Sequence, residues 1–159
     1  MTASLLSGRR IALACLLGLL LSLHASAPRA GAEGSDEGVV ILLNARNPTQ
    51  SLGAGEISKI FLGQTAFWHG VVPVRVVLRP DGNIAAKTFY ESVLKMTPQA
   101  FRKHWDELQL SGRAVAPKAV ASAEEVAAMI GQAPGAIGYA LASEAWKLNN
   151  KAVKIVQVH

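Results

Sequence analysis

Three runs of mostly apolar residues stand out along the chain, at 39–43, 71–78 and 136–141. The first of them, 39–43, is a continuous apolar run, which is typical of a strand that is buried on both faces of a sheet. A more mixed run at 153–158 predicts a final strand near the end of the chain. The apolar pattern therefore predicts four strands, of which 39–43 is expected to be buried on both faces.

Between these runs, apolar residues recur at helical spacing and are bracketed by capping residues. Gly63 is placed to end one helix, Thr97 and Pro98 to begin another, and Ser122 with Glu125 to form a capping box. The predicted helices cover residues 56–62, 84–96, about 98–109, 123–132 and 144–148.

Strands that alternate with helices indicate an α/β fold, with a mostly parallel sheet flanked by helices. We find no internal repeat and no low-complexity tract. Residues 33–38 are polar and rich in glycine, so we expect a flexible lead-in there. Residues 39–159 are enough chain for one domain.

Residues 1–32 have the pattern of a signal peptide. Arg9 and Arg10 precede an apolar stretch, and small residues in Ala-x-Ala spacing end at Ala27 and again at Ala32. Pro28 would hinder the first cut, so we place cleavage after Ala32. The apolar stretch is short of the roughly 20 residues that a spanning helix needs. We therefore expect a periplasmic protein without a stable membrane anchor after cleavage.

Removal of this segment changes the charge and the cysteine count. The formal charge of the whole chain is +5, and loss of three arginines leaves 13 basic and 11 acidic residues, a charge of +2. The single cysteine, Cys15, also lies in the removed segment, so no disulfide is expected. No basic tract is present, which argues against nucleic acid as a partner.

The stretch from Arg79 to Asn83 is the best candidate for a binding site. It follows an apolar strand and precedes a helix, so backbone N–H groups of Asn83, Ile84 and Ala85 would point at one place. Arg79 offers a bidentate fork for an oxyanion, and Asp81 would accept a hydrogen bond from a protonated one such as hydrogen phosphate. The alternative is an ordinary Pro-Asp-Gly turn beside a solvated arginine.

No pattern of an enzyme or a metal site accompanies this stretch. His69, His104 and His159 lie far apart without metal-ligand spacing, and the sequence has no nucleophile elbow and no P-loop. We therefore expect a non-enzymatic protein with no catalytic residue, no metal and no cofactor.

Four segments in order resemble the phosphate ABC transporter substrate-binding proteins (PstS-like). They are residues 57–63 followed by Trp68, the unit 74–94 with its Arg79 and Asp81, Pro134-Gly135-Ala136-Ile137-Gly138-Tyr139, and residues 145–150. The resemblance implies a single lobe of the type II periplasmic-binding-protein fold. It also implies a phosphate-like oxyanion held at a helix N-terminus, and an ABC permease as a partner.

The chain departs from that family in two respects. It is about half as long, so a homodimer or a partner protein would have to supply the second lobe. Where the family has a Ser-Gly-Thr loop, this chain has Asn83, Ile84 and Ala85, which lack the hydroxyls. We expect a substrate-binding domain linked to phosphate uptake. The alternative is a periplasmic interaction or accessory protein that kept the lobe and lost the ligand.

Overall fold

The computed structural model describes residues 38–156 and 158–159. The expected signal peptide, residues 1–32, and all of the lead-in except Gly38 lie outside the described residues. Among the helices of the described part, none is both long and apolar enough to cross a membrane.

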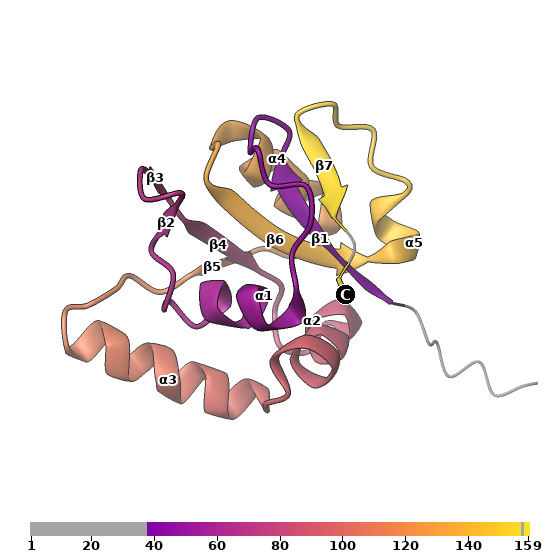
Figure 1. Cartoon of the computed structure of the whole chain (residues 1–159). Coiled ribbons are helices and arrows are strands. Elements are labelled where there is room, and N and C mark those ends of the chain that lie inside the picture. The colour runs from indigo at the N-terminus through magenta and orange to yellow at the C-terminus, as the bar shows by residue number, and fades with distance from the viewer. Residues whose placement is uncertain (1–37, 157) are drawn as a thin grey trace, which may run out of the picture. The chain divides into compact units, whose positions relative to one another are not determined.

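A five-stranded sheet forms the centre of the described domain (Figure 1), in the order β5-β4-β6-β1-β7. The strands are β1 (Val39–Asn44), β4 (Arg75–Leu78), β5 (Lys118–Ala119), β6 (Ala136–Leu141) and β7 (Val153–Val156). A separate hairpin pairs β2 (Phe67–Trp68) with β3 (Val72–Pro73).

Four of the five strands run in one direction, and β1 runs against them. β4 pairs in parallel with β5 and with β6, whereas β1 lies antiparallel between β6 and β7. Helices connect β4 to β5 and β5 to β6, as parallel pairing requires. The expected α/β class, with a mostly parallel sheet flanked by helices, is confirmed.

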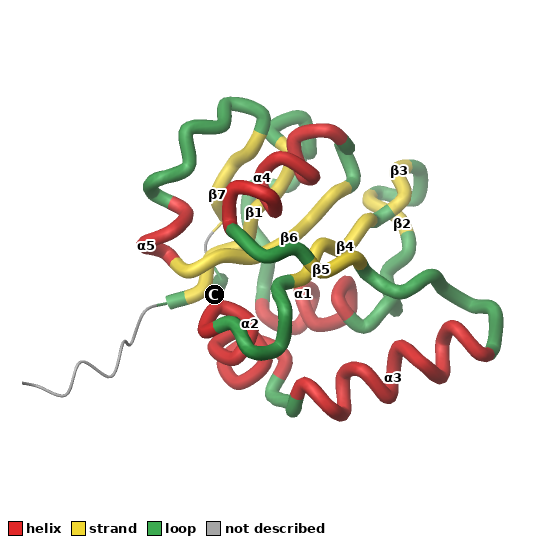
Figure 2. The backbone as a smooth tube through the Cα atoms, turned by 180° about the vertical axis from the view of Figure 1, so that it is seen from behind, coloured by secondary structure: helices red, strands yellow, loops and turns green. Residues whose placement is uncertain are grey.

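Helices cover both faces of the sheet (Figure 2). α1 (Ala54–Phe61), α2 (Ile84–Phe89) with its π-helical continuation η1 (Tyr90–Leu94), and α3 (Pro98–Leu110) lie on one side. α4 (Ala123–Gln132) packs on the other side, and α5 (Ala142–Ala145) follows β6 directly.

The side chains of β1 alternate between two hydrophobic cores. Val39, Ile41 and Leu43 pack with α1, α2 and α3, whereas Val40 and Leu42 pack with α4. Since successive side chains of a strand point to opposite faces, a strand buried on both faces must be apolar throughout. This explains the continuous apolar run that marks β1 in the sequence.

An aromatic cluster fills the first core directly beneath the end of β4. Tyr139 of β6 stacks on Phe89 with ring centroids 4.1 Å apart, and Phe61 of α1 packs against both rings. All three side chains are fully buried. The cluster therefore fixes the position of the Tyr139 hydroxyl, which reaches the binding-site candidate described below.

The structure changes several predicted boundaries. The predicted strand 71–78 is divided into β3 and β4, because the N–H of Val74 donates to Ala66 instead of to a strand neighbour. The predicted helix 84–96 ends at Leu94, and Lys95 takes a left-handed conformation with φ 53°. The N-caps at Thr97 and Ser122 are confirmed, since both hydroxyls accept backbone N–H groups. The predicted capping box is incomplete, because Glu125 accepts the N–H of Ala121 and not that of Ser122.

Candidate functional site

Arg79 follows the last residue of β4, and its side chain is buried, only 3% exposed. Its guanidinium faces the carboxylate of Glu144, with Nη1 3.1 Å from Oε2 and 3.3 Å from Oε1. Nη2 donates to the same Oε1 and, at 3.0 Å, to the backbone carbonyl of Ala121. The fork that was expected to meet an oxyanion is thus engaged by a carboxylate of the chain itself.

The backbone of Arg79 is also held. Its N–H donates to the Tyr139 hydroxyl at 3.2 Å. Burial raises the pKa of Tyr139 to about 12, although this hydrogen bond and the charge of Arg79 both act to lower it. The hydroxyl is therefore neutral at ordinary pH and serves as an acceptor for the strand end.

One atom of Arg79 remains unsatisfied. Within the described part of the chain, Arg79 Nε is the one buried side-chain polar atom without a hydrogen-bond partner. A buried donor without an acceptor costs about 1–3 kcal/mol. The arrangement around Glu144 therefore satisfies most of the guanidinium's donors and leaves one without an acceptor.

Glu144 connects two parts of the site. It lies in α5, with its side chain 29% exposed, and Oε2 also accepts the N–H of Leu141 at 3.1 Å. Its carboxylate therefore accepts the N-cap N–H of α5 and pairs with Arg79 at the same time. Because one edge of the carboxylate meets solvent, Glu144 is the more accessible member of this pair.

Asp81 is paired as well. Its carboxylate forms an ion pair with Arg102 of α3 and accepts a hydrogen bond from the Tyr90 hydroxyl at 3.2 Å. Burial, and secondarily the neighbouring Tyr139, raise the pKa of Tyr90, so that this hydroxyl donates over the whole ordinary pH range. Arg102 is 57% exposed, and its pair with Asp81 lies at the surface of the site.

The three backbone N–H groups that were expected to bind the anion differ in whether they already have a hydrogen-bond partner. The N–H of Asn83 donates to Pro80 at 2.8 Å, and that of Ala85 donates to the side-chain oxygen of Asn83 at 2.8 Å. Asn83 is thus the N-cap of α2. Ile84 is half exposed. Two of the three donors already have partners in the turn.

A small cavity of about 260 Å³ lies beside the end of β4. The structure brings Arg79 and Asp81 together in its lining, whereas Asn83, Ile84 and Ala85 are not part of it. Arg102 and Tyr90 line it too. Glu144 and Ala121, which hold the guanidinium of Arg79, lie outside this lining.

The sequence reasoning did not include Glu144, Arg102 and Tyr90 in the site. Arg102 and Tyr90 come from the helices that follow the turn, at helical positions with no distinguishing pattern. Glu144 was interpreted only as part of a short helix. Its proximity to Arg79 depends on the parallel pairing of β4 with β6, which no local signal reveals.

No group of three or more histidine, cysteine, aspartate or glutamate side chains in the described part of the chain could hold a metal ion. His104 of α3 is half-buried, with Nε2 2.8 Å from the carbonyl of Leu62.

Comparison with known proteins gives a consistent picture. No family model and no curated protein matches the chain. A putative phosphate ABC transporter substrate-binding protein with bound phosphate from Clostridium perfringens superposes with a TM-score of 0.59 at 20% identity, over 76% of this chain and 44% of that one.

Two further solved structures agree. An ABC-type phosphate transport receptor from Vibrio cholerae gives a TM-score of 0.54 at 19% identity, over 76% of this chain and 46% of that one. PstS from Borrelia burgdorferi gives 0.56 at 14% identity, over 76% and 47%. The chain spans less than half the length of each of these proteins. The described domain therefore has the fold of one part of a PstS-like phosphate substrate-binding protein.

Proposed function

We propose that this chain is a non-enzymatic, PstS-like substrate-binding domain that recognises a phosphate-like oxyanion at the end of β4. The observation that carries the proposal is the meeting of Arg79 and Asp81 at one cavity, in a chain whose fold is that of phosphate-binding receptors. A guanidinium and a carboxylate together would select a partly protonated oxyanion, because the carboxylate repels one that carries no proton.

In this proposal Glu144, which lies outside the cavity lining, releases Arg79 so that its guanidinium can turn toward an anion in the cavity. Glu144 is the partly exposed member of the pair, and one rotation of its side chain toward solvent would release the fork. The turn at Asn83, Ile84 and Ala85 then contributes the positive end of α2. Arg102 also lines the cavity, paired with Asp81, and Asp106 adds a second carboxylate to the lining.

The wider setting of the proposal is uptake through an ABC permease. It includes export to the periplasm through the segment at 1–32, and a second wall for the ligand from a homodimer or from a partner protein. Support comes from the names of the structural neighbours, which are phosphate transport receptors.

The contacts of Arg79 favour a second candidate function. Because its fork is engaged by Glu144 and the N–H groups of Asn83 and Ala85 have partners in the turn, the lobe is internally satisfied. A periplasmic interaction or accessory protein that no longer binds a ligand would have such a site. This candidate requires that phosphate produce no response at all.

Calorimetric titration with phosphate and with sulfate separates the two functions. The receptor proposal expects heat with phosphate, less with sulfate, loss of binding in Arg79→Ala, and loss of the preference for phosphate in Asp81→Asn. Absence of heat at millimolar phosphate, or unchanged affinity in Arg79→Ala, would contradict it. Thermal unfolding of each variant shows whether it is folded.

Arg46→Ala is the matched control. Arg46 is exposed and follows β1 at the end of the sheet where β4 begins, opposite Arg79. Its removal subtracts one positive charge without touching the site, so phosphate affinity should stay the same. Size-exclusion chromatography of the same samples, with and without phosphate, shows whether a second copy completes the site.

A further inference from the structure

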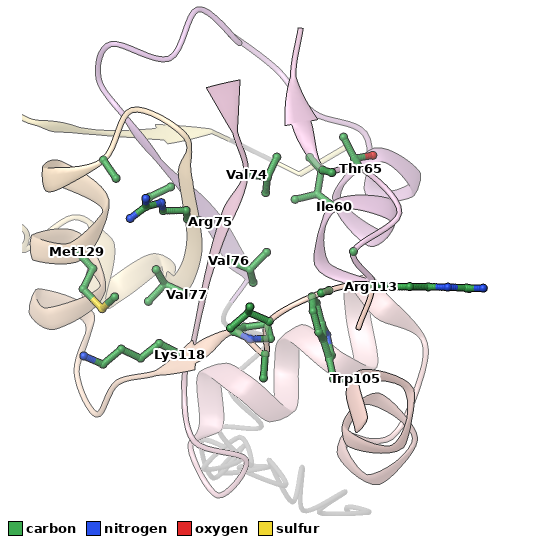
Figure 3. A pocket seen from close by; sticks show the side chains of 18 of the residues that line it. Ile60, Thr65, Val74, Arg75, Val76, Val77, Trp105, Arg113, Lys118 and Met129 are labelled. Carbon is green, nitrogen blue, oxygen red and sulfur yellow. The ribbon is translucent and has the colours of Figure 1, made fainter. Parts of the chain in front are cut away.

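A larger cavity, of about 840 Å³, lies along the outer edge of β4 (Figure 3). Its lining comes from both faces of the sheet. Val74 and Val76 lie on the side of β4 toward Ile60 and Trp105, whereas Arg75 and Val77 lie on the side toward Met129 of α4. A cavity that both faces line must straddle the edge of the strand, where a neighbouring strand would lie.

The neighbouring strand is present along only part of that edge. β5 has two residues, and its pairing with β4 consists of Val77↔Lys118 and Leu78↔Ala119. Arg75 and Val76, in contrast, pair only with β6 within the described residues. The first half of β4 therefore has a strand on one side and the cavity on the other.

The backbone of β4 is oriented to accept a strand there. The N–H of Arg75 donates to Gly135 at 3.0 Å, on the β6 side. Because successive peptide groups of a strand point to alternate edges, the N–H of Val76 is directed to the opposite edge, toward the cavity. An added strand would meet this backbone group in the same register in which β5 meets the second half of β4.

The side chains around the cavity define the chemistry of an occupant. The lining is largely apolar and includes Val115, which is 88% exposed. It also contains three cations, Arg75, Arg113 and Lys118, and among the described residues no aspartate or glutamate lines it. An apolar strip bordered by positive charge complements an extended segment in which apolar side chains alternate with acidic ones.

We propose that the edge of β4 binds an extended acidic and apolar segment of a partner protein by strand addition. The segment lies in the cavity, continues the line of β5 along Arg75 and Val76, and directs its acidic side chains toward Arg75 and Lys118. Main-chain hydrogen bonds supply affinity, and the alternate side chains supply specificity. This surface adjoins the cavity at the end of β4, with which it shares Trp105, Ala116 and Pro117, and the proposed binding does not require phosphate.

The probe is a fluorescein-labelled peptide of about eight residues in which valine alternates with aspartate, long enough for one strand. Its binding to the purified protein is measured by fluorescence anisotropy in phosphate-free buffer. We expect saturable binding that weakens with salt. The double variant Arg75→Glu/Lys118→Glu should weaken binding at least about tenfold.

Two controls test charge and backbone separately. Lys147→Glu/Lys151→Glu makes the same charge change at exposed positions outside the cavity and should leave affinity unchanged. A peptide N-methylated at every second residue, on the edge that faces β4, should lose binding, because it cannot donate to the β4 edge. Amide exchange at Val76 should slow when the unmodified peptide binds.

Four outcomes would overturn the proposal. The first three are absence of binding at millimolar peptide, equal weakening by both double variants, and full binding by the N-methylated peptide. The fourth is a dimer of the protein that excludes the peptide from this edge, because the edge would then bind a second copy of the chain.

Discussion

Arg79 and Glu144 lie 65 residues apart in the sequence and form a partly buried ion pair at the end of β4. The pair joins β4 to α5 across the neighbouring strand β6. Removal of one member of such a pair leaves the other uncompensated, which is more costly than loss of both. The coupling between the two side chains is therefore measurable.

A double-mutant cycle should show this coupling. We expect Arg79→Met and Glu144→Gln each to lower the free energy of unfolding by about 2–4 kcal/mol, somewhat below the range for fully buried pairs because Glu144 meets solvent. The double variant should lose less than the sum of the two. Urea unfolding followed by circular dichroism gives all four values.

The exposed pair Lys103 and Glu107 provides the matched comparison. Its nitrogen and oxygen are 4.0 Å apart, with side chains 80% and 66% exposed. The same cycle with Lys103→Met and Glu107→Gln should give a coupling of at most about 0.5 kcal/mol. Equal coupling in the two cycles would mean that burial of Arg79 contributes nothing.

Removal of the Glu144 carboxylate should make the domain sensitive to added anions. Glu144→Ala leaves the Arg79 guanidinium without its partner and opens space beside it. Any anion that binds the folded state there stabilises it by mass action. We expect phosphate and formate to raise the melting temperature of this variant more than that of the wild-type chain.

Sodium chloride at matched ionic strength serves as the control for screening in this experiment. The double variant Arg79→Met/Glu144→Ala should show no specific response, because the guanidinium is gone. A response of equal size in that double variant would place the anion elsewhere.

The sequence was sufficient for the fold and insufficient for the contacts of the site. Continuous apolar runs predicted β1 and β6, since a strand with helices on both faces cannot carry polar side chains. Capping residues such as Ser122 predicted helix starts, because their hydrogen bonds are local. The two-residue β5 has no periodic pattern, and its position depends on β4. Burial of Arg79 was not foreseen, because an arginine at a strand end is usually solvated.

Gly135 should tolerate no side chain. A Cβ at this position would lie 2.0 Å from the carbonyl oxygen of Pro73, and the Gly135 carbonyl accepts from both Trp68 Nε1 and the N–H of Arg75. Gly135→Ala must push apart the hairpin and β6. We expect a loss of about 1–3 kcal/mol or more, measured as a lower urea midpoint.

Gly82→Ala is the control for that substitution. A Cβ on Gly82 would meet nothing within 4 Å, so the free energy of unfolding should change by no more than about 0.5 kcal/mol. A wild-type midpoint in Gly135→Ala would contradict the close approach of Pro73.

Alkaline pH should destabilise the domain through Tyr139. Burial raises its pKa to about 12, above the value of about 10 in an unfolded chain. The neutral hydroxyl is favoured in the folded state, so this contribution is complete below about pH 10 and is lost as pH rises toward 12, by up to about 1.4 kcal/mol per pH unit. Denaturant unfolding from pH 8 to 11 measures the decline.

Tyr139→Phe separates the two effects of the hydroxyl. At pH 8 the variant should be less stable by about 1 kcal/mol, because the N–H of Arg79 loses its acceptor. Its decline toward pH 11 should be shallower than that of the wild-type chain. An identical slope would assign the alkaline loss to other groups, among them Tyr90, whose pKa burial also raises.

The position of β1 has a consequence for how the domain reaches its native state. Among the strands of residues 38–156, β1 is the first, yet both of its sheet neighbours, β6 and β7, are the last two. During synthesis, nearly the whole domain must be made before the backbone groups of β1 have their native partners. Pairing between distant segments slows folding, because the entropy of closing the long loop is lost first. We therefore expect the sheet to form only after the last strand has been synthesised, rather than progressively from the N-terminus.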